Sequence, residues 1–477
     1  MACSLAPPSD DLTPRLAPQH AAAAPSRAAA AAYSTVATFN HSHAWLFSPV
    51  SRGNVRWSAD ALYAAFHDNQ HPEDCRRARY LFVENDLPGS GLGMLSKLLI
   101  AALRLAARDG RVMVEVPHRN RSGIIQQLWC DRPPHTLSCV FEPWSHCQAT
   151  SDRSTARSTA RPHLIRRPDR FEWPLKARKV RIPLTYVLFW GGLWMGQSSW
   201  MDVQLQRLLL ARVLFRPRQW VRAIGDCVLT THHLQQPKRL ATIFPFVASV
   251  TSPFTALFVR DSPEKRKELG GHPTPPLHIY SRLALALGRS LGAPRLFLQT
   301  SSPNALSYFQ SFAANASLPL AYTEHAREER DGWGKATEPA LAMEHATIAA
   351  VNLHVASKAV AFVSLAHSMW TTIQLASLSA GAADGRSNGD GGGGGGEGGG
   401  GGGVDDSSGG ESGSQEGSLI SPLSWIQVRC KGSPLDIRIA TRRSLHGTGP
   451  GVEHLKALIA QEEALKCRVM GFKEEGS

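Results

Sequence analysis

Hydrophobic and polar positions alternate along much of this chain in the pattern of an α/β protein. Short apolar runs bounded by Gly, Pro or polar residues predict buried strands, and apolar residues at three- and four-residue spacing predict helices. The first such unit predicts a strand at Tyr80–Glu84, a Gly/Pro-rich turn, a helix at Leu95–Arg108 that ends at Gly110, and a strand at Val112–Val116. A β-loop-α-β unit of this kind indicates a parallel sheet covered by helices.

The same alternation is most regular after residue 254, where four strand–helix repeats follow one another. The predicted strands are 255–259, 295–299, 318–322 and 360–364, and the predicted helices are 277–291, 304–313, 338–357 and 367–378. A helix at 201–224 precedes these repeats, and a strand at 425–429 and a helix at 451–466 follow them. The fold class is therefore α/β, with two Rossmann-like domains, an arrangement typical of two-domain sugar-nucleotide transferases that bind their ligand at strand C-terminal ends.

Changes in composition along the chain divide it into a leader and two predicted domains. Residues 1–74 form a low-complexity leader and a weakly patterned N-terminal segment, residues 75–245 the first Rossmann-like domain, and residues 246–477 the second. Of 41 glycines, 12 lie in one tract within 380–418, which lacks an apolar face and predicts a disordered insertion inside the second domain. Outside the low-complexity leader and this insertion, the chain of 477 residues is long enough to form two domains.

The net charge of +13 is concentrated in a second insertion, at 153–181. Ten Lys or Arg and two acids between Arg153 and Arg181 supply +8 of this charge. An Arg-, Ser- and Pro-rich stretch favours a solvated surface arm over a nucleic-acid patch, so no nucleic-acid partner is expected. Contact with an anionic membrane or another polyanion is the remaining alternative.

Eight cysteines occur without a Cys-x-x-Cys pair, which argues against a zinc ribbon. Cys130, Cys139 and Cys147 cluster, with Cys75 one domain-width earlier, and this grouping suits a set of lumenal disulfides, with ordinary reduced thiols as the alternative. No apolar run reaches the 18 residues of a membrane helix, and no clear signal-peptide core is visible. The cysteines and the apolar runs leave the compartment open.

Three segments carry candidate chemistry. Arg260 follows a predicted buried strand, at the end where an α/β sheet presents ligands. Its planar guanidinium is suited to binding a diphosphate. The alternative is a loop arginine held in a salt bridge. Ser368 opens a helix after a strand, where free N–H groups bind anions, although a plain helix cap explains it equally well. The turn Gly89–Gly93 is Gly-rich, but its spacing does not fit G-x-G-x-x-G.

These segments, in this order and with the clustered cysteines between the domains, resemble the α1,6-fucosyltransferase superfamily. That group includes the core N-glycan and bacterial nodulation fucosyltransferases and, more distantly, the protein O-fucosyltransferases. The resemblance covers 75–147 and 250–378 and lies in order and spacing more than in identity. It implies a GT-B-like architecture, a GDP-fucose donor, a glycan or glycoprotein acceptor, inversion at the anomeric carbon, neither metal nor cofactor, and a place in the secretory pathway.

The resemblance also implies roles for single residues. Arg260 falls on the arginine that binds the donor diphosphate, and Glu268 on the glutamate proposed to deprotonate the acceptor hydroxyl. Thr300 keeps the threonine of the family's Leu-Ala-Thr-Asp-Asp strand end, and Asn352 stands in place of the aspartate that binds the base. Ser368 keeps one serine of the family's Ser-Ser-Gln turn.

Departures from the family pattern affect mainly the nucleobase. Phe258 replaces a histidine, Asn352 replaces an aspartate, and Ser301 and Ser302 replace two acids. An amide imitates only part of a carboxylate's pairing with base N–H groups. The sequence therefore predicts a fucosyltransferase-like transferase whose diphosphate contacts are kept, with a catalytically degenerate glycan- or nucleotide-binding protein of the same fold as the alternative.

Overall fold

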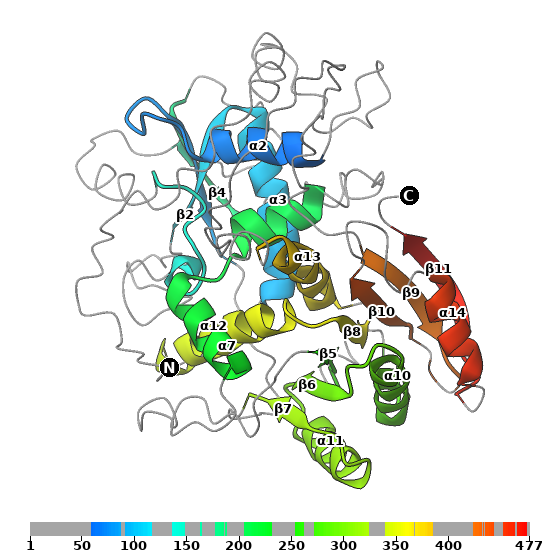
Figure 1. The fold of residues 1–477 in the computed structure, drawn as a ribbon. Coiled ribbons are helices and arrows are strands. Elements are labelled where there is room, and N and C mark those ends of the chain that lie inside the picture. The colour runs from blue at the N-terminus through cyan, green and yellow to red at the C-terminus, as the bar shows by residue number, and fades with distance from the viewer. Residues whose placement is uncertain are drawn as a thin grey trace, which may run out of the picture.

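The computed structural model describes residues 59–86, 91–116, 136–147, 163–164, 177–185, 187, 205–230, 253–261, 271–323, 339–366, 368–384, 423–431, 433, 435–442, 452–462 and 465–474. Figure 1 shows their arrangement as two β-sheets with helices on their faces. The helices are α2 (Ala59–Gln70), α3 (Leu92–Arg108), α7 (Gln219–Thr230), α10 (Leu277–Ser290), α11 (Pro303–Asn315), α12 (Pro339–Ala356), α13 (Met369–Asp384) and α14 (Val452–Gln461), with a 3-10 turn η2 (Leu137–Cys139) and a π-helical turn η4 (Leu209–Leu214).

The first sheet has four parallel strands in the order β2-β1-β4-β3. They are β1 (Arg79–Glu84), β2 (Arg111–Val116), β3 (His163–Leu164) and β4 (Lys179–Pro183). In β4, Val180 and Ile182 are buried and alternate with Arg181, which forms an ion pair with Glu84 of β1. This strand corrects the predicted extent of the basic insertion, because the end of the segment 153–181 belongs to the sheet.

The second sheet has seven strands in the order β11-β9-β10-β8-β5-β6-β7. They are β5 (Phe254–Phe258), β6 (Arg295–Gln299), β7 (Leu320–Tyr322), β8 (Ala361–Leu365), β9 (Leu423–Arg429), β10 (Ile437–Arg442) and β11 (Arg468–Glu474). The strands β7, β6, β5 and β8 are parallel, and β10, β9 and β11 continue the sheet in antiparallel pairs. Numbered along the chain, the parallel strands have the spatial order third, second, first, fourth, which is the order of the first four strands of a Rossmann fold. The four predicted strand–helix repeats are confirmed.

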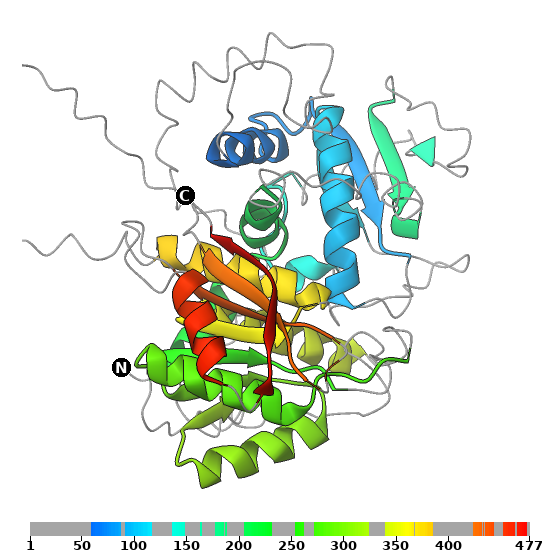
Figure 2. The ribbon, with the colours of Figure 1, turned by 90° about the vertical axis from the view of Figure 1, so that its right-hand side faces the viewer.

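The two faces of the second sheet pack into different cores. Leu257, Leu298 and Val363 face a cluster that includes α10 and α14, whereas Phe254 and Phe362 face a larger cluster. This larger cluster also contains apolar residues of the first sheet and of α3, α7, α12 and α13. Figure 2 shows the two sheets in separate parts of the molecule with these helices around the region between them. One apolar core therefore joins both sheets.

Several boundaries differ from those predicted. The helix expected at 201–224 is interrupted, because a π-helical turn ends before Pro217 and α7 begins at Gln219. Helix α13 continues to Asp384, five residues into the predicted insertion at 380–418. Helix α2 lies in the segment predicted to be weakly patterned and buries Phe66. Residues 1–58 and 385–422 lie outside the described residues, and the predicted domain limits stay predictions.

Two disulfides are present in the described part of the chain, Cys75–Cys147 and Cys430–Cys467, and Cys139 is also disulfide-bonded. The predicted disulfide set is thus confirmed for Cys75, Cys139 and Cys147. The helices among the described residues include none that is long and apolar enough to cross a membrane.

Candidate functional site

The candidate site lies at the carboxyl edge of the second sheet, between β5 and β8. The next strand along the chain, β6, lies on one side of β5, and β8 lies on the other side. The strand order therefore reverses between β5 and β8. In open α/β sheets ligands bind in the crevice outside the carboxyl ends of the strands at such a reversal. Arg260 follows β5 by two residues and Ser368 follows β8 by three, so both predicted residues lie at this place.

Arg260 and Thr300 leave neighbouring strands at the same edge. The main-chain N–H of Val259 donates to the carbonyl of Gln299 (3.0 Å), which extends the pairing of β5 with β6 up to both residues. Arg260 is half-buried, whereas Thr300 is buried and its Oγ accepts the N–H of Ser302 (3.1 Å). The Thr300 hydroxyl therefore shapes the turn into α11, and Arg260 is the more accessible of the two.

Ser368 precedes the first turn of α13 and is buried. Its N–H donates to the carbonyl of Leu365 (3.2 Å), while its Oγ has no hydrogen-bond partner among the described residues. The first N–H groups of a helix have no acceptor within the helix, and the helix dipole adds partial positive charge there. No acidic residue occupies the first turn of α13. This helix start can accept an anion, with an unsatisfied hydroxyl beside it.

A row of side chains, polar apart from Phe258, crosses the end of the sheet on the face toward α12 and α13. In register, Ser364 of β8 lies beside Phe258 of β5, which lies beside Gln299 of β6. Gln374 of α13 donates from Nε2 to Gln299 Oε1 (2.8 Å), and both amides keep one buried atom without a partner in the described structure. Sequence reasoning missed these residues, although a polar residue at or near the end of an apolar strand is a signal that could have found them.

Asn352 is fully buried in α12, behind this row. Its Nδ2 donates to Thr323 Oγ (3.2 Å), which follows β7, and its Oδ1 has no partner among the described residues. The predicted base-binding residue is therefore held at the same sheet edge, but the amide is engaged in an internal contact. Glu268, the predicted base for the acceptor hydroxyl, lies outside the described residues.

An arginine pair that the sequence did not single out adjoins this row. Arg438 of β10 is the register partner of Ser364, and its guanidinium lies 4.7 Å from the centre of the Trp425 ring. Burial and the nearby Arg207 lower the pKa of Arg438 to about 10. The Arg438 Nε atom has no hydrogen-bond partner in the described structure. Two arginines that repel one another beside an incompletely satisfied polar edge favour an anionic ligand.

The start of α3 lies against the start of α13. A Cβ atom placed on Gly93, in the first turn of α3, would stand 2.8 Å from Met369 Cβ and 3.1 Å from the main-chain N of Trp370. Like α13, α3 has no acidic residue in its first turn, and it follows the carboxyl end of β1. The positive ends of one helix from each sheet therefore meet, which only glycine permits at this distance.

Polar groups also gather at the carboxyl edge of the first sheet. Glu115 of β2 is buried, accepts the N–H of Leu137 (2.9 Å), and has its pKa raised to about 8 by burial. Asn85, which follows β1, is buried beside it in an apolar surround, and neither of its amide atoms has a partner within the described structure. Asp86 accepts the N–H of Thr185 (2.9 Å) after β4. This edge holds two strand ends together, and burial favours the protonated form of Glu115.

Comparison with known proteins adds little to this geometry. No family model and no curated protein matches the sequence. Among solved structures, an arginine-to-lysine mutant of FUT1 from Arabidopsis thaliana in complex with GDP is similar, with 11% sequence identity and a TM-score of 0.30. The match covers 67% of this chain and 72% of the other.

Proposed function

We propose that the protein is a nucleotide-sugar-dependent glycosyltransferase of the inverting, metal-independent kind, with GDP-fucose as donor and a glycan or glycoprotein as acceptor. The proposal joins the sequence resemblance to the geometry of the second sheet. The observation that carries it is the meeting of the α3 and α13 helix starts at Gly93 and Met369, next to the strand ends that bear Arg260 and Ser368.

A diphosphate is the ligand that this arrangement suits best. It carries several negative charges, and helix N-termini, arginines and free hydroxyl groups are the groups that bind phosphate oxygens. Arg260 would bind both phosphates through its planar guanidinium, and the Ser368 hydroxyl would donate to one of them. The two helix starts would both add positive potential, because the positive end of a helix dipole is its N-terminus.

Such a site would promote departure of a nucleoside diphosphate. The acceptor oxygen attacks the anomeric carbon on the face opposite the diphosphate, the bond from that carbon to the diphosphate oxygen breaks, and the configuration inverts. Glu268 would take the acceptor proton. Groups fixed in place where negative charge develops lower the barrier without having to reorganise, and Arg260 and the α13 helix start would supply them.

A second candidate, a nucleotide- or glycan-binding protein that no longer turns over, rests on specific contacts. Ser302, which stands where the family has an acid, accepts the N–H of Ala305 (3.1 Å) and caps α11. Asn352 is bonded to Thr323 instead of facing open space. Both positions therefore serve the fold, which favours this second candidate.

The first experiment measures nucleotide binding by calorimetry with GDP, GDP-fucose and UDP. Wild-type protein should bind GDP, and Arg260→Ala should weaken binding about tenfold or more, because a charge-assisted hydrogen bond contributes about 1.5–3 kcal/mol. The matched control is Arg295→Ala, which removes an arginine from the opposite, amino edge of the same sheet. Equal affinities in wild type and Arg260→Ala, or no binding by either, would contradict the proposal.

The second experiment separates the transferase from the binding protein. Release of GDP from GDP-fucose is followed with and without a mixed pool of glycoprotein acceptors. Turnover that Glu268→Gln abolishes while GDP affinity is kept supports the transferase. Binding without hydrolysis or transfer supports the degenerate form.

The secretory pathway is the proposed compartment. The disulfides Cys75–Cys147 and Cys430–Cys467 support it, because disulfides form in oxidising compartments. Secreted protein from a cell expressing the full chain, with both bonds intact by peptide mapping, is the expected result. Reduced thiols at both pairs after rapid alkylation in cells would contradict it.

A further inference from the structure

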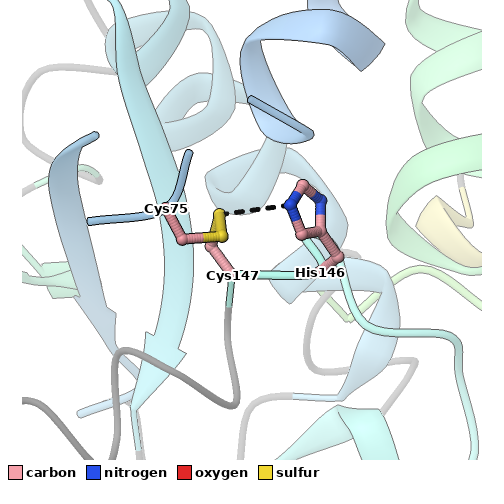
Figure 3. Close-up of side chains that lie close together, drawn as sticks. All are labelled: Cys75, His146 and Cys147. Atoms are coloured by element: carbon pink, nitrogen blue, oxygen red, sulfur yellow. Dashed lines mark hydrogen bonds between the residues drawn. A yellow bond between two sulfur atoms is a disulfide. The ribbon is translucent and has the colours of Figure 1, made fainter. Parts of the chain in front are cut away.

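A cluster of sulfur and imidazole groups lies away from the nucleotide site, beside the first sheet. Figure 3 shows the Cys75–Cys147 disulfide with the His146 ring next to its sulfur atoms. His146 Nε2 lies 3.7 Å from Cys147 Sγ, and one ligand atom from each of these three residues lies within 4.8 Å of the others. The chain brings them together from the segment before β1 and from the loop after η2.

His71 lies on the other side of the His146 ring. The main-chain N–H of His146 donates to His71 Nδ1 (3.4 Å), and His146 Nδ1 lies 3.2 Å from the same atom. A disulfide sulfur has no hydrogen, so in the oxidised form the contact with Cys147 Sγ needs the hydrogen on His146 Nε2. Metal binding at Nε2 would move this hydrogen to Nδ1, which faces His71. A histidine that binds a metal through one ring nitrogen and donates through the other is the usual metal-binding form.

We propose that the Cys75–Cys147 pair is reversibly reduced and that its reduced form binds a zinc-like divalent cation together with His146. Tetrahedral zinc with Zn–S bonds of about 2.3 Å and Zn–N bonds of about 2.0–2.1 Å separates a sulfur from a nitrogen ligand by about 3.5 Å. The observed 3.7 Å between Cys147 Sγ and His146 Nε2 already matches this edge. Three protein ligands leave the fourth position to water.

The reduction needs a dithiol reductant, such as a thioredoxin-like protein. Cys75 is half-buried and Cys147 fully buried, so Cys75 Sγ is the sulfur open to attack. The reductant's thiolate bonds to Cys75 Sγ, the bond to Cys147 Sγ breaks, and Cys147 leaves as a thiolate. The second thiol of the reductant then displaces Cys75 and forms the reductant's own disulfide. The cation replaces the protons of the two thiols, which pass to solvent.

The second disulfide provides the matched control. Cys430–Cys467 has no histidine in a comparable group among the described residues, and only the Cys75 cluster there brings three such ligands together. His67 serves as a control for His71, because its ring packs on His71 (centroids 4.4 Å apart) but does not belong to the group.

The test uses the full chain, oxidised and after reduction with a phosphine, titrated with Co²⁺ as a spectroscopic probe and with Zn²⁺. The reduced protein should show the thiolate-to-cobalt charge-transfer band and the visible bands of a tetrahedral site, and zinc should protect Cys75 and Cys147 from alkylation. The oxidised protein should show neither. His146→Ala and His71→Ala should weaken binding about 10–100-fold, whereas His67→Ala and Cys430→Ser/Cys467→Ser should retain it.

Two results would overturn the proposal. One is equal cobalt spectra for reduced and oxidised wild-type protein, a comparison that requires no variant to fold. The other is reduced protein whose spectrum is unchanged by His146→Ala, with Cys75 and Cys147 alkylated equally fast with and without zinc. The pair would then be a structural disulfide only.

Discussion

Gly93 of α3 lies so close to Met369 of α13 that a Cβ atom on Gly93 would stand 2.8 Å from Met369 Cβ. Gly93→Ala should therefore force the two helices apart and lower the free energy of unfolding by about 1–3 kcal/mol. GDP binding should weaken as well, because the helix starts separate. Urea denaturation and calorimetric titration measure the two effects. Gly471→Ala is the control, since a Cβ there meets nothing within 4 Å; equal stabilities of the two variants would refute the close contact.

Arg438→Gln should separate binding from stability. The substitution removes a partly buried charge that Arg207 repels, so the free energy of unfolding should change by less than about 1 kcal/mol after loss of the contact with Trp425. GDP affinity should fall about tenfold, because the substitution removes a positive charge beside the strand end that bears Ser364.

The comparison for Arg438 is Arg429→Gln on the neighbouring strand β9. Arg429 Nε donates to the buried Asp436 carboxylate (2.6 Å), so its loss should lower stability and leave GDP affinity unchanged. An Arg438→Gln variant that is strongly destabilised, or that binds GDP as wild type does, would argue against a role in anion binding.

Glu115 should make stability fall as pH rises. Its pKa is about 8 in the folded protein and 4.5 in the unfolded chain, so between these values the unfolded state releases a proton that the folded state keeps. Each pH unit in this window costs up to about 1.4 kcal/mol. Glu115→Gln keeps an oxygen for the Leu137 N–H and should flatten this slope. Urea denaturation between about pH 5 and 8 tests it; parallel curves for both proteins would show that Glu115 is ionised in the folded state.

The ion pair between Glu84 and Arg181 should hold β1 and β4 together. Arg181 Nε and Nη2 donate to the two Glu84 carboxylate oxygens at 2.9 and 2.7 Å, and Glu84 is buried. Arg181→Met leaves a buried carboxylate without its partner and should cost about 2–4 kcal/mol. Adding Glu84→Gln should recover much of this loss. A double-mutant cycle measured by urea denaturation gives the coupling energy of the two side chains. A value near zero would mean that the ion pair adds nothing to the free energy of unfolding.

The strand–helix repeats of the second sheet could be predicted because their strands are buried on both faces. Runs such as Phe254–Phe258 and Ala361–Leu365 have no charged, solvent-facing residue that would interrupt their mostly apolar sequence. The strands β4 and β10 were not predicted, because arginines alternate with their apolar residues. Arg181 and Arg438 look like surface charge in the sequence, and only the sheet brings Glu84 and Trp425 to them.

The position of Arg260, Thr300 and Ser368 at strand ends could also be predicted, because parallel strands present their carboxyl ends at one edge. The sequence could not indicate that Asn352 would be bonded to Thr323, since this contact joins a helix to a strand end 29 positions away. The arginine pair was hidden for a similar reason. Contacts between elements depend on packing, and local pattern does not encode packing.

The apolar core shared by the two sheets has a consequence for unfolding. Residues from β1, α3, α13 and β8 belong to one buried cluster, so neither sheet keeps this shared cluster if the other melts. Heating should then give a single endothermic transition for the whole molecule, in place of the two steps of independent domains. Movement between the sheets would have to leave α13 packed on α3.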